Sequence, residues 1–210
     1  MLNIDRLPLF IFASIVLLLT PGPAVLYIIA RSVDQGRAAG LVSVLSVEVG
    51  NFFHAVAAAL GLSALLFSSA TAFSVVKYLG AAYLIYLGVR KLLSKSAALT
   101  ETRVQPQSMR RIFSQGVTVA VLNPKTALFF LAFLPQFVDR SRGQIPLQLL
   151  SLGCLFVLMA IVSDGMYALL ASSAGQWLKS QQKIWLFERY VVGLIYIGLG
   201  ITAALADHPQ

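Results

Sequence analysis

The sequence predicts an all-α integral membrane protein, in which six transmembrane helices form two inverted three-helix repeats with broken first helices. Three observations lead to this prediction. The chain is 58% hydrophobic and only 11% charged, whereas about 25% of the residues are charged in soluble domains. It contains six apolar runs near the roughly 20 residues that a spanning helix needs. Proline breaks, carboxylates and a Tyr-Leu-Gly-like string recur in the same order in both halves of the chain.

The apolar runs define the domain organisation. We place them at 8–30, 39–67, 73–93, 112–138, 145–172 and 184–206. Residues 1–93 and 112–210 then contain three helices each, and residues 94–111 form a basic linker between the two repeats. Small residues, among them Gly36 and Gly40, offer positions where neighbouring helices can approach closely.

The basic residues predict the orientation of the chain. Eleven lysine and arginine residues lie in the connections after the first, third and fifth runs, against four on the other side. By the positive-inside rule, the linker 94–111 is cytoplasmic and both termini face outward. The linker can also contact anionic lipid, but no nucleic-acid motif accompanies it, so we expect no nucleic-acid partner. With one cysteine and no cofactor motif, we expect neither a metal site nor a cofactor.

Two motifs interrupt apolar runs that otherwise predict continuous helices. Thr20-Pro21-Gly22-Pro23 lies inside the first run, and Asn123-Pro124-Lys125 lies inside the fourth. Proline has no N–H to donate and clashes with the preceding turn, so each motif must break or kink its helix. Inside a membrane, the freed backbone groups are tolerated only where they face protein or a water-filled cavity. The motifs therefore predict either a binding site or, in the simpler alternative, a packing kink.

The same features occur in the same order in the two halves of the chain. The proline breaks lie 103 positions apart, Glu48 and Asp164 lie 116 apart, and the similar strings 83–88 and 193–198 lie 110 apart. Three helices per half is an odd number, so the second repeat enters the membrane from the opposite side. Inverted repeats are typical of secondary transporters that work by alternating access. Chance similarity between apolar strings is the alternative.

Three ionisable side chains fall well inside the predicted helices. They are Glu48, Lys125 and Asp164. An ionisable group near the bilayer centre costs at least about 2.5–3.5 kcal/mol, so it usually faces a cavity or a partner. Asn51 follows Glu48 by three residues and shares its helix face. These residues predict a polar chamber near the membrane midplane.

The polar chamber has two interpretations. In the functional one, Lys125 lies beside carbonyls freed near Val121 and Leu122 and attracts a substrate carboxylate, while Asp164 or Glu48 takes an ammonium group or a proton. In the structural one, Lys125 and one of the carboxylates form a buried ion pair that holds the helices together. Desolvation and the partner charge act in opposite directions on such groups, so proton coupling is compatible with both.

Several of these motifs resemble one known family. The resemblance runs over about residues 8–206 and is to the lysine exporter family, nearer its homoserine/threonine-exporter branch. Its motifs are Thr20-Pro21-Gly22-Pro23, Gly36, Gly40, Asn123-Pro124-Lys125 and Phe129-Phe130-Leu131-Ala132-Phe133-Leu134-Pro135-Gln136-Phe137. Relatives usually carry a glycine and a small residue where this chain has Ser46 and Glu48, which leaves the substrate open.

The resemblance implies export of amino acids or related metabolites across the bacterial inner membrane, driven by the proton motive force. It assigns a transport role to the residues of both breaks. An amino-acid-like substrate, protons and the lipid bilayer are then the expected partners, and a homo-oligomer is compatible with the sequence. Two other classes stay open: a channel for small polar solutes, and a membrane enzyme using Glu48 and Asp164 as an acid and a base.

Overall fold

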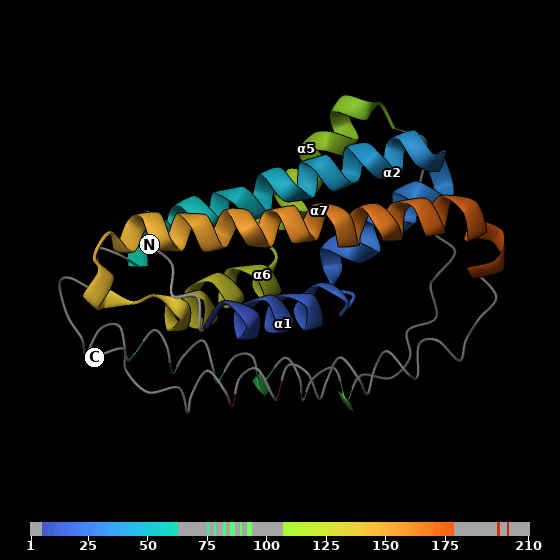
Figure 1. The fold of residues 1–210 in the computed structure, drawn as a ribbon. Coiled ribbons are helices and arrows are strands. Elements are labelled where there is room, and N and C mark those ends of the chain that lie inside the picture. Colours follow the sequence, from blue (N-terminus) through green and yellow to red (C-terminus); the bar gives the residue numbers. More distant parts are fainter. Residues whose placement is uncertain are drawn as a thin grey trace.

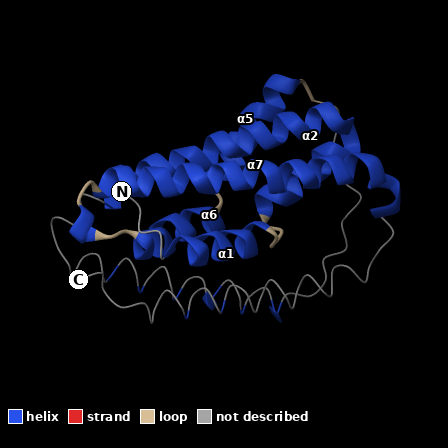
Figure 2. Cartoon of the chain, in the orientation of Figure 1, coloured by secondary structure: helices blue, strands red, loops and turns tan. Residues whose placement is uncertain are grey.

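The computed structural model describes residues 6–62 and 107–178, together with isolated positions between 75 and 93 and the residues Ile197 and Ile201. Every regular element in this part of the chain is a helix (Figure 2), which confirms the all-α prediction. Most of the predicted third and sixth runs, 73–93 and 184–206, lies outside the described residues. So do the two similar strings, apart from isolated positions, and all but the end of the linker 94–111.

Two of the described helices are broken by proline, and two elements, α2 and α7, are long. In chain order the described elements are α1 (Leu7–Leu18), α2 (Pro23–Ala57), η2 (Ala58–Leu62), α5 (Met109–Val121), α6 (Pro124–Leu128), η3 (Phe129–Phe133), η4 (Leu134–Phe137), η5 (Arg140–Arg142) and α7 (Ile145–Leu178). Both predicted breaks are confirmed, because α1 stops at Leu18 before the first motif and α5 stops at Val121 before the second.

The helix after the first break extends further than the sequence predicts. We expected one run to end at residue 30 and the next to begin at residue 39, but α2 continues from Pro23 to Ala57. Only Gly36 departs from helical angles, with φ 79° and ψ −173°. This left-handed region favours glycine. A Cβ at Gly36 would meet nothing within 4 Å, so its predicted packing role is wrong. Gly40 does pack closely, against Ser32 and Ala168.

Gly36 folds α2 back on itself into a first arm, residues 23–35, and a second arm, residues 37–57. The first arm runs antiparallel to α5, whereas the second arm runs parallel to it. Contacting pairs give these directions: Arg31–Gln115 and Gln35–Gln107 for the first arm, and Ser46–Gly116 and Gly50–Ala120 for the second. One helix cannot be both parallel and antiparallel to the same neighbour unless it reverses direction. The two arms therefore correspond to the end of the first predicted run and most of the second.

The two broken helices lie antiparallel to each other along their lengths. At one end Arg6 Nη1 donates to Gln136 O at 3.0 Å, and at the other the first arm of α2 meets α5. The second arm of α2 is likewise antiparallel to α7 (Figure 1), since Gly40 lies against Ala168 and Ala55 against Gly153. Both breaks consequently lie at the same level, between the second arm of α2 and α7.

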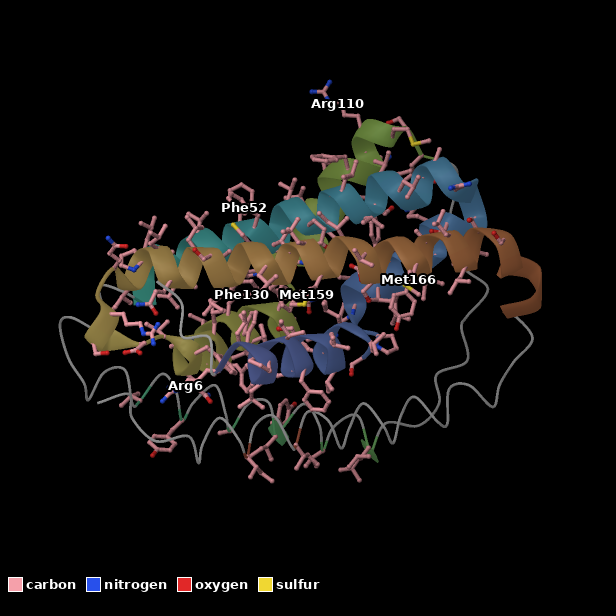
Figure 3. All side chains as sticks on the ribbon, in the orientation of Figure 1. Arg6, Phe52, Arg110, Phe130, Met159 and Met166 are labelled. Carbon is pink, nitrogen blue, oxygen red and sulfur yellow. The ribbon has the colours of Figure 1, made fainter. Side chains whose placement is uncertain are left out.

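An aromatic cluster joins α1, the helices after the second break, and α7. Phe129 contacts Phe156 with ring centroids 4.9 Å apart, and Phe10 contacts Phe137 at 5.2 Å. Such pairs add to the energy of apolar burial. Phe130 is 1% exposed and lies between helices, whereas Phe52 is 45% exposed and points outward (Figure 3). The cluster fixes the start of α6 relative to α1, and thereby positions Lys125.

The described helices include several that are long and apolar enough to cross a membrane. Two pass by length and composition, Pro23–Gly61 and Ile145–Ser173, and the pair Met109–Val121 and Pro124–Phe137, bent by 42°, makes a third candidate. Because Gly36 folds α2 back, Pro23–Gly61 is two segments, and its first arm continues the span that α1 begins. The arrangement of six helices in two repeats stays a prediction.

Candidate functional site

Lys125 completes the hydrogen bonding of the first break. In an unbroken helix the N–H of residue 21 would donate to Leu17 O, but proline has no hydrogen there. A tight turn supplies one bond to Leu17 O, from Thr20 N at 3.1 Å. The ammonium group of Lys125 supplies another at 2.6 Å, and it also donates to Thr20 O. A lysine from the second break thus supplies hydrogen bonds to carbonyl groups of the first break.

Tyr167 replaces the donor that Pro23 lacks. The N–H of residue 23 would have reached Leu19 O in a continuous helix. Instead the hydroxyl group of Tyr167, on α7, donates to Leu19 O at 2.9 Å. This residue lies one turn after Asp164 on the same helix face. The polar face of α7 therefore serves both the break and the carboxyl group.

His54 has the corresponding role at the second break. Pro124 removes the donor for Ala120 O, which accepts the N–H of Asn123 at 3.0 Å. Nε2 of His54, on the second arm of α2, lies 3.2 Å from the same oxygen. A carbonyl oxygen only accepts, so Nε2 carries the hydrogen. Each break is therefore closed by a side chain from a long helix of the opposite half: α7 for the first and α2 for the second.

Asn123 and Gly22 give Lys125 its position. Asn123 Oδ1 accepts the backbone N–H of Lys125 at 3.1 Å, and its Nδ2 donates to Thr126 Oγ1 at 3.0 Å. This side-chain cap starts α6 immediately after the break. A Cβ at Gly22 would lie 3.0 Å from Lys125 Cδ, so the glycine leaves room for the lysine stem to reach Leu17 and Thr20.

Two carboxyl groups lie beside the lysine. Glu48, on the second arm of α2, accepts a hydrogen bond from Asn51 Nδ2 at 3.0 Å, and its carboxyl group lies near that of Asp164 on α7. Asp164 also interacts electrostatically with Lys125. Glu48 is 4% exposed and Asp164 is 3% exposed. Glu48 Oε1 and Asp164 Oδ1 have no hydrogen-bond partner among the described residues. Two ionised carboxylates cannot donate to each other, so a direct bond between them would need a proton on one.

A small cavity lies between the two breaks and the carboxyl groups. Its volume of about 20 Å³ is room for about one water molecule. Its polar side chains are those of Asn51, Asn123, Lys125, Thr126 and Asp164, and Gly22 also lines it. These residues come from α6, α7, both breaks and the second arm of α2. Among the described residues the cavity is too small for an amino acid, so a larger solute needs the lining to move apart.

The structure brings the predicted site residues together, with two differences. Thr20 and Gly22 of the first break lie against Lys125, while Pro21 and Pro23 interrupt the helix there. Asn123 and Pro124 start the helix of Lys125. Asn51 and Asp164 line the other side of the cavity, and Glu48 bonds to Asn51. The carbonyls beside Lys125, however, are those of Leu17 and Thr20, not those near Val121 and Leu122. Among the described residues, no carboxylate oxygen lies within the 4.0 Å of a direct ion pair with Lys125, and Asp164 acts on the lysine from a greater distance.

His54 and Tyr167 have no functional role that the sequence pattern predicts. One signal was present: the carbonyl orphaned by a proline lies four residues before it, and each needs a donor from elsewhere. Which side chain supplies the donor depends on helix packing, which no local pattern shows.

The chain matches a family model and several named relatives over nearly its whole length. The model described as LysE type translocator matches residues 15–207. The chain is 30% identical to the homoserine/homoserine lactone efflux protein of Salmonella typhimurium, with 95% of this chain and 96% of the relative covered. It is 31% identical to an uncharacterized membrane protein of Bacillus subtilis, with 94% and 97% covered. The leucine efflux protein of Salmonella choleraesuis is 26% identical, with 93% and 92% covered. No solved structure matches the chain.

These matches decide between a transporter and an enzyme. A full-length match to a translocator model and to efflux proteins identifies a membrane transporter rather than an enzyme. The acid and base alternative for Glu48 and Asp164 is thereby excluded. The broken helices and the match over residues 15–207 lead to one conclusion: the chain belongs to the LysE type translocator family.

Proposed function

We propose that this chain is a secondary exporter of amino acids or closely related metabolites that works by alternating access around the cavity between the two breaks. The observation that carries the proposal is Lys125. This buried cation comes from one broken helix and donates to the break of the other, next to two buried carboxyl groups. The names of relatives, homoserine/homoserine lactone efflux and leucine efflux, support amino acids as the substrate class.

The charges of the site complement those of a zwitterion. Lys125 has three N–H donors, of which two are used in the closed state. The first turn of α2 adds free backbone N–H groups at Ala24 and Val25, because its cap, Gly22, has no side chain. Helix N-termini attract carboxylates. The substrate carboxylate therefore binds between Lys125 and the start of α2, and its ammonium group lies toward Asp164 and Glu48.

The antiparallel arrangement of the described helices supports alternating access as the mechanism. If residues 1–93 and 112–210 are inverted repeats, a two-fold axis in the membrane plane passes between the two breaks. Exchange of conformation between the repeats then opens the same cavity first to one side and then to the other. The described residues support this idea because α1 and the first arm of α2 run antiparallel to the second broken helix, and the second arm runs antiparallel to α7.

The carboxyl pair is our candidate for proton coupling. Two buried carboxyl groups close to each other repel when both are ionised, so the pair retains one proton. A substrate ammonium group brings the same charge and can replace that proton. Coupled exchange of the two would let an inward proton gradient drive export. With the orientation predicted from the basic residues, the linker 94–111 is cytoplasmic and the protein lies in the bacterial inner membrane.

The test is efflux from proteoliposomes loaded with a panel of labelled amino acids, with and without an imposed pH gradient. We expect saturable efflux of a narrow group that rises with the gradient, and its loss in Lys125→Met. Arg110→Ala is the control, because it removes an exposed cation on α5 (Figure 3). Flux that neither saturates nor depends on the gradient would indicate a channel. No flux of any amino acid would overturn the proposal.

A further inference from the structure

The first break contains a binding site that Lys125 already fills. We propose that Leu17 O and Thr20 O form a site for a primary ammonium group, which Lys125 occupies in the empty carrier and the amino group of the substrate occupies in the loaded one. The second half of this statement rests on the proposed export function. The first half concerns only the chemistry of the break and can be tested without transport.

The acceptors of this site come from the C-terminal end of α1. The helix ends at Leu18, with no basic residue in its last turn. Carbonyl oxygens at a helix C-terminus carry partial negative charge, and the missing N–H of Pro21 leaves Leu17 O with unused capacity. Two such oxygens converge on one Nζ atom. This geometry suits a cation that donates several directed hydrogen bonds.

Asp164 is the third group that favours a cation at this site. Lys125 is 6% exposed, so its charge is largely removed from water. An isolated buried ammonium is expensive, and here two carbonyl groups and the nearby Asp164 carboxyl group stabilise it. A substrate ammonium group has the same charge and the same three donors as Lys125. It can therefore replace the lysine on Leu17 O and Thr20 O with its third N–H toward Asp164.

Exchange of Lys125 for a substrate ammonium group also explains why the break has carbonyl groups at one end and N–H groups at the other. The end of α1 offers carbonyl groups, and the start of α2, after four intervening residues, offers free N–H groups. A zwitterion across the break binds its ammonium group to the first and its carboxylate to the second. Lys125, displaced by the ammonium group, becomes available to the carboxylate. When the substrate leaves, Lys125 returns and the buried carbonyls are not left unsatisfied.

The experiment replaces the lysine by a free amine. Lys125→Ala removes three methylene groups and the ammonium group, which together correspond to n-propylammonium. In detergent, we expect the variant to unfold at a midpoint about 5 °C or more below the wild-type chain. Added n-propylammonium should restore a large part of this loss in a saturable way. Tetramethylammonium, which has no N–H, and Na⁺ at equal ionic strength should not.

Lys125→Met is the matched control. Its side chain fills the space of the lysine stem but cannot donate, so it should lose stability and gain nothing from n-propylammonium. Equal effects of n-propylammonium and tetramethylammonium on Lys125→Ala, or equal effects on the alanine and methionine variants, would overturn the ammonium site. Recovery with Na⁺ alone would also overturn it, in favour of a metal cation.

A second measurement uses the wild-type chain, in case the Lys125→Ala variant is not produced in the membrane. In the wild-type chain, an exported amino acid should raise the unfolding midpoint, while its analogue without the amino group should not. Equal stabilisation by both compounds would contradict the inference. The two proposals fail separately: selective rescue by n-propylammonium without amino-acid export leaves the ammonium site standing, whereas export without selective rescue removes the site and leaves the exporter.

Discussion

Gly22→Ala tests whether the reach of Lys125 across the break determines stability. The backbone of Gly22 is extended, with φ −120° and ψ −173°, so alanine adopts it without strain. The only obstacle is the contact of 3.0 Å between the new Cβ and Lys125 Cδ. A flexible stem can yield by a few tenths of an ångström, so we expect the low end of overpacking costs, about 1 kcal/mol. For a chain of 210 residues this corresponds to a fall of about 2–4 °C in the unfolding midpoint.

A double-mutant cycle followed by thermal unfolding in detergent isolates this contact. In the Lys125→Ala background the stem is absent, so Gly22→Ala should cost nothing, and the coupling between the two sites should be about 1 kcal/mol. Gly165→Ala is the control, because a Cβ there meets nothing within 4 Å and alanine favours a helix over glycine. Additive losses from Gly22→Ala and Lys125→Ala would refute the contact, and so would a Gly22→Ala variant as stable as the wild-type chain.

Three further predictions concern the other polar groups. His54→Ala removes a second donor from Ala120 O, which keeps the bond from Asn123 N, and should cost about 0.5–1.5 kcal/mol in thermal unfolding; full stability would contradict its role at the second break. Glu48→Gln keeps a hydrogen-bonding side chain but no proton to exchange, so efflux from proteoliposomes should persist and lose its dependence on the pH gradient; unchanged gradient dependence would assign coupling elsewhere. In the loop before α7, hydrogen bonds from Ser141 hold the pKa of Asp139 below its ordinary value. Its contribution to stability is therefore present above the pKa of the unfolded chain and is lost as the pH falls through the folded pKa. Asp139→Asn should remove that part of the acid dependence of the unfolding midpoint, and an unaltered profile would show that the loop contributes none of it.

Much of the fold and part of the site can be predicted from sequence because their causes are local. Apolar composition and run length determine that the chain is a helical membrane protein. A proline breaks its helix wherever it lies, so both breaks were predicted at the right residues. Glu48 and Asn51 share a face by helix periodicity alone, and the structure joins them by a hydrogen bond.

Packing between distant segments decided what the site contains. Lys125 binds Leu17 O and Thr20 O, which are 108 and 105 positions away along the chain, and His54 reaches Ala120 O across 66. The reversal at Gly36 likewise depends on a positive φ, which glycine permits but does not require. A proline specifies that a carbonyl loses its donor, but the replacement donor depends on which helices pack against the break. That choice is a property of the whole assembly of helices, so only the tertiary structure reveals it.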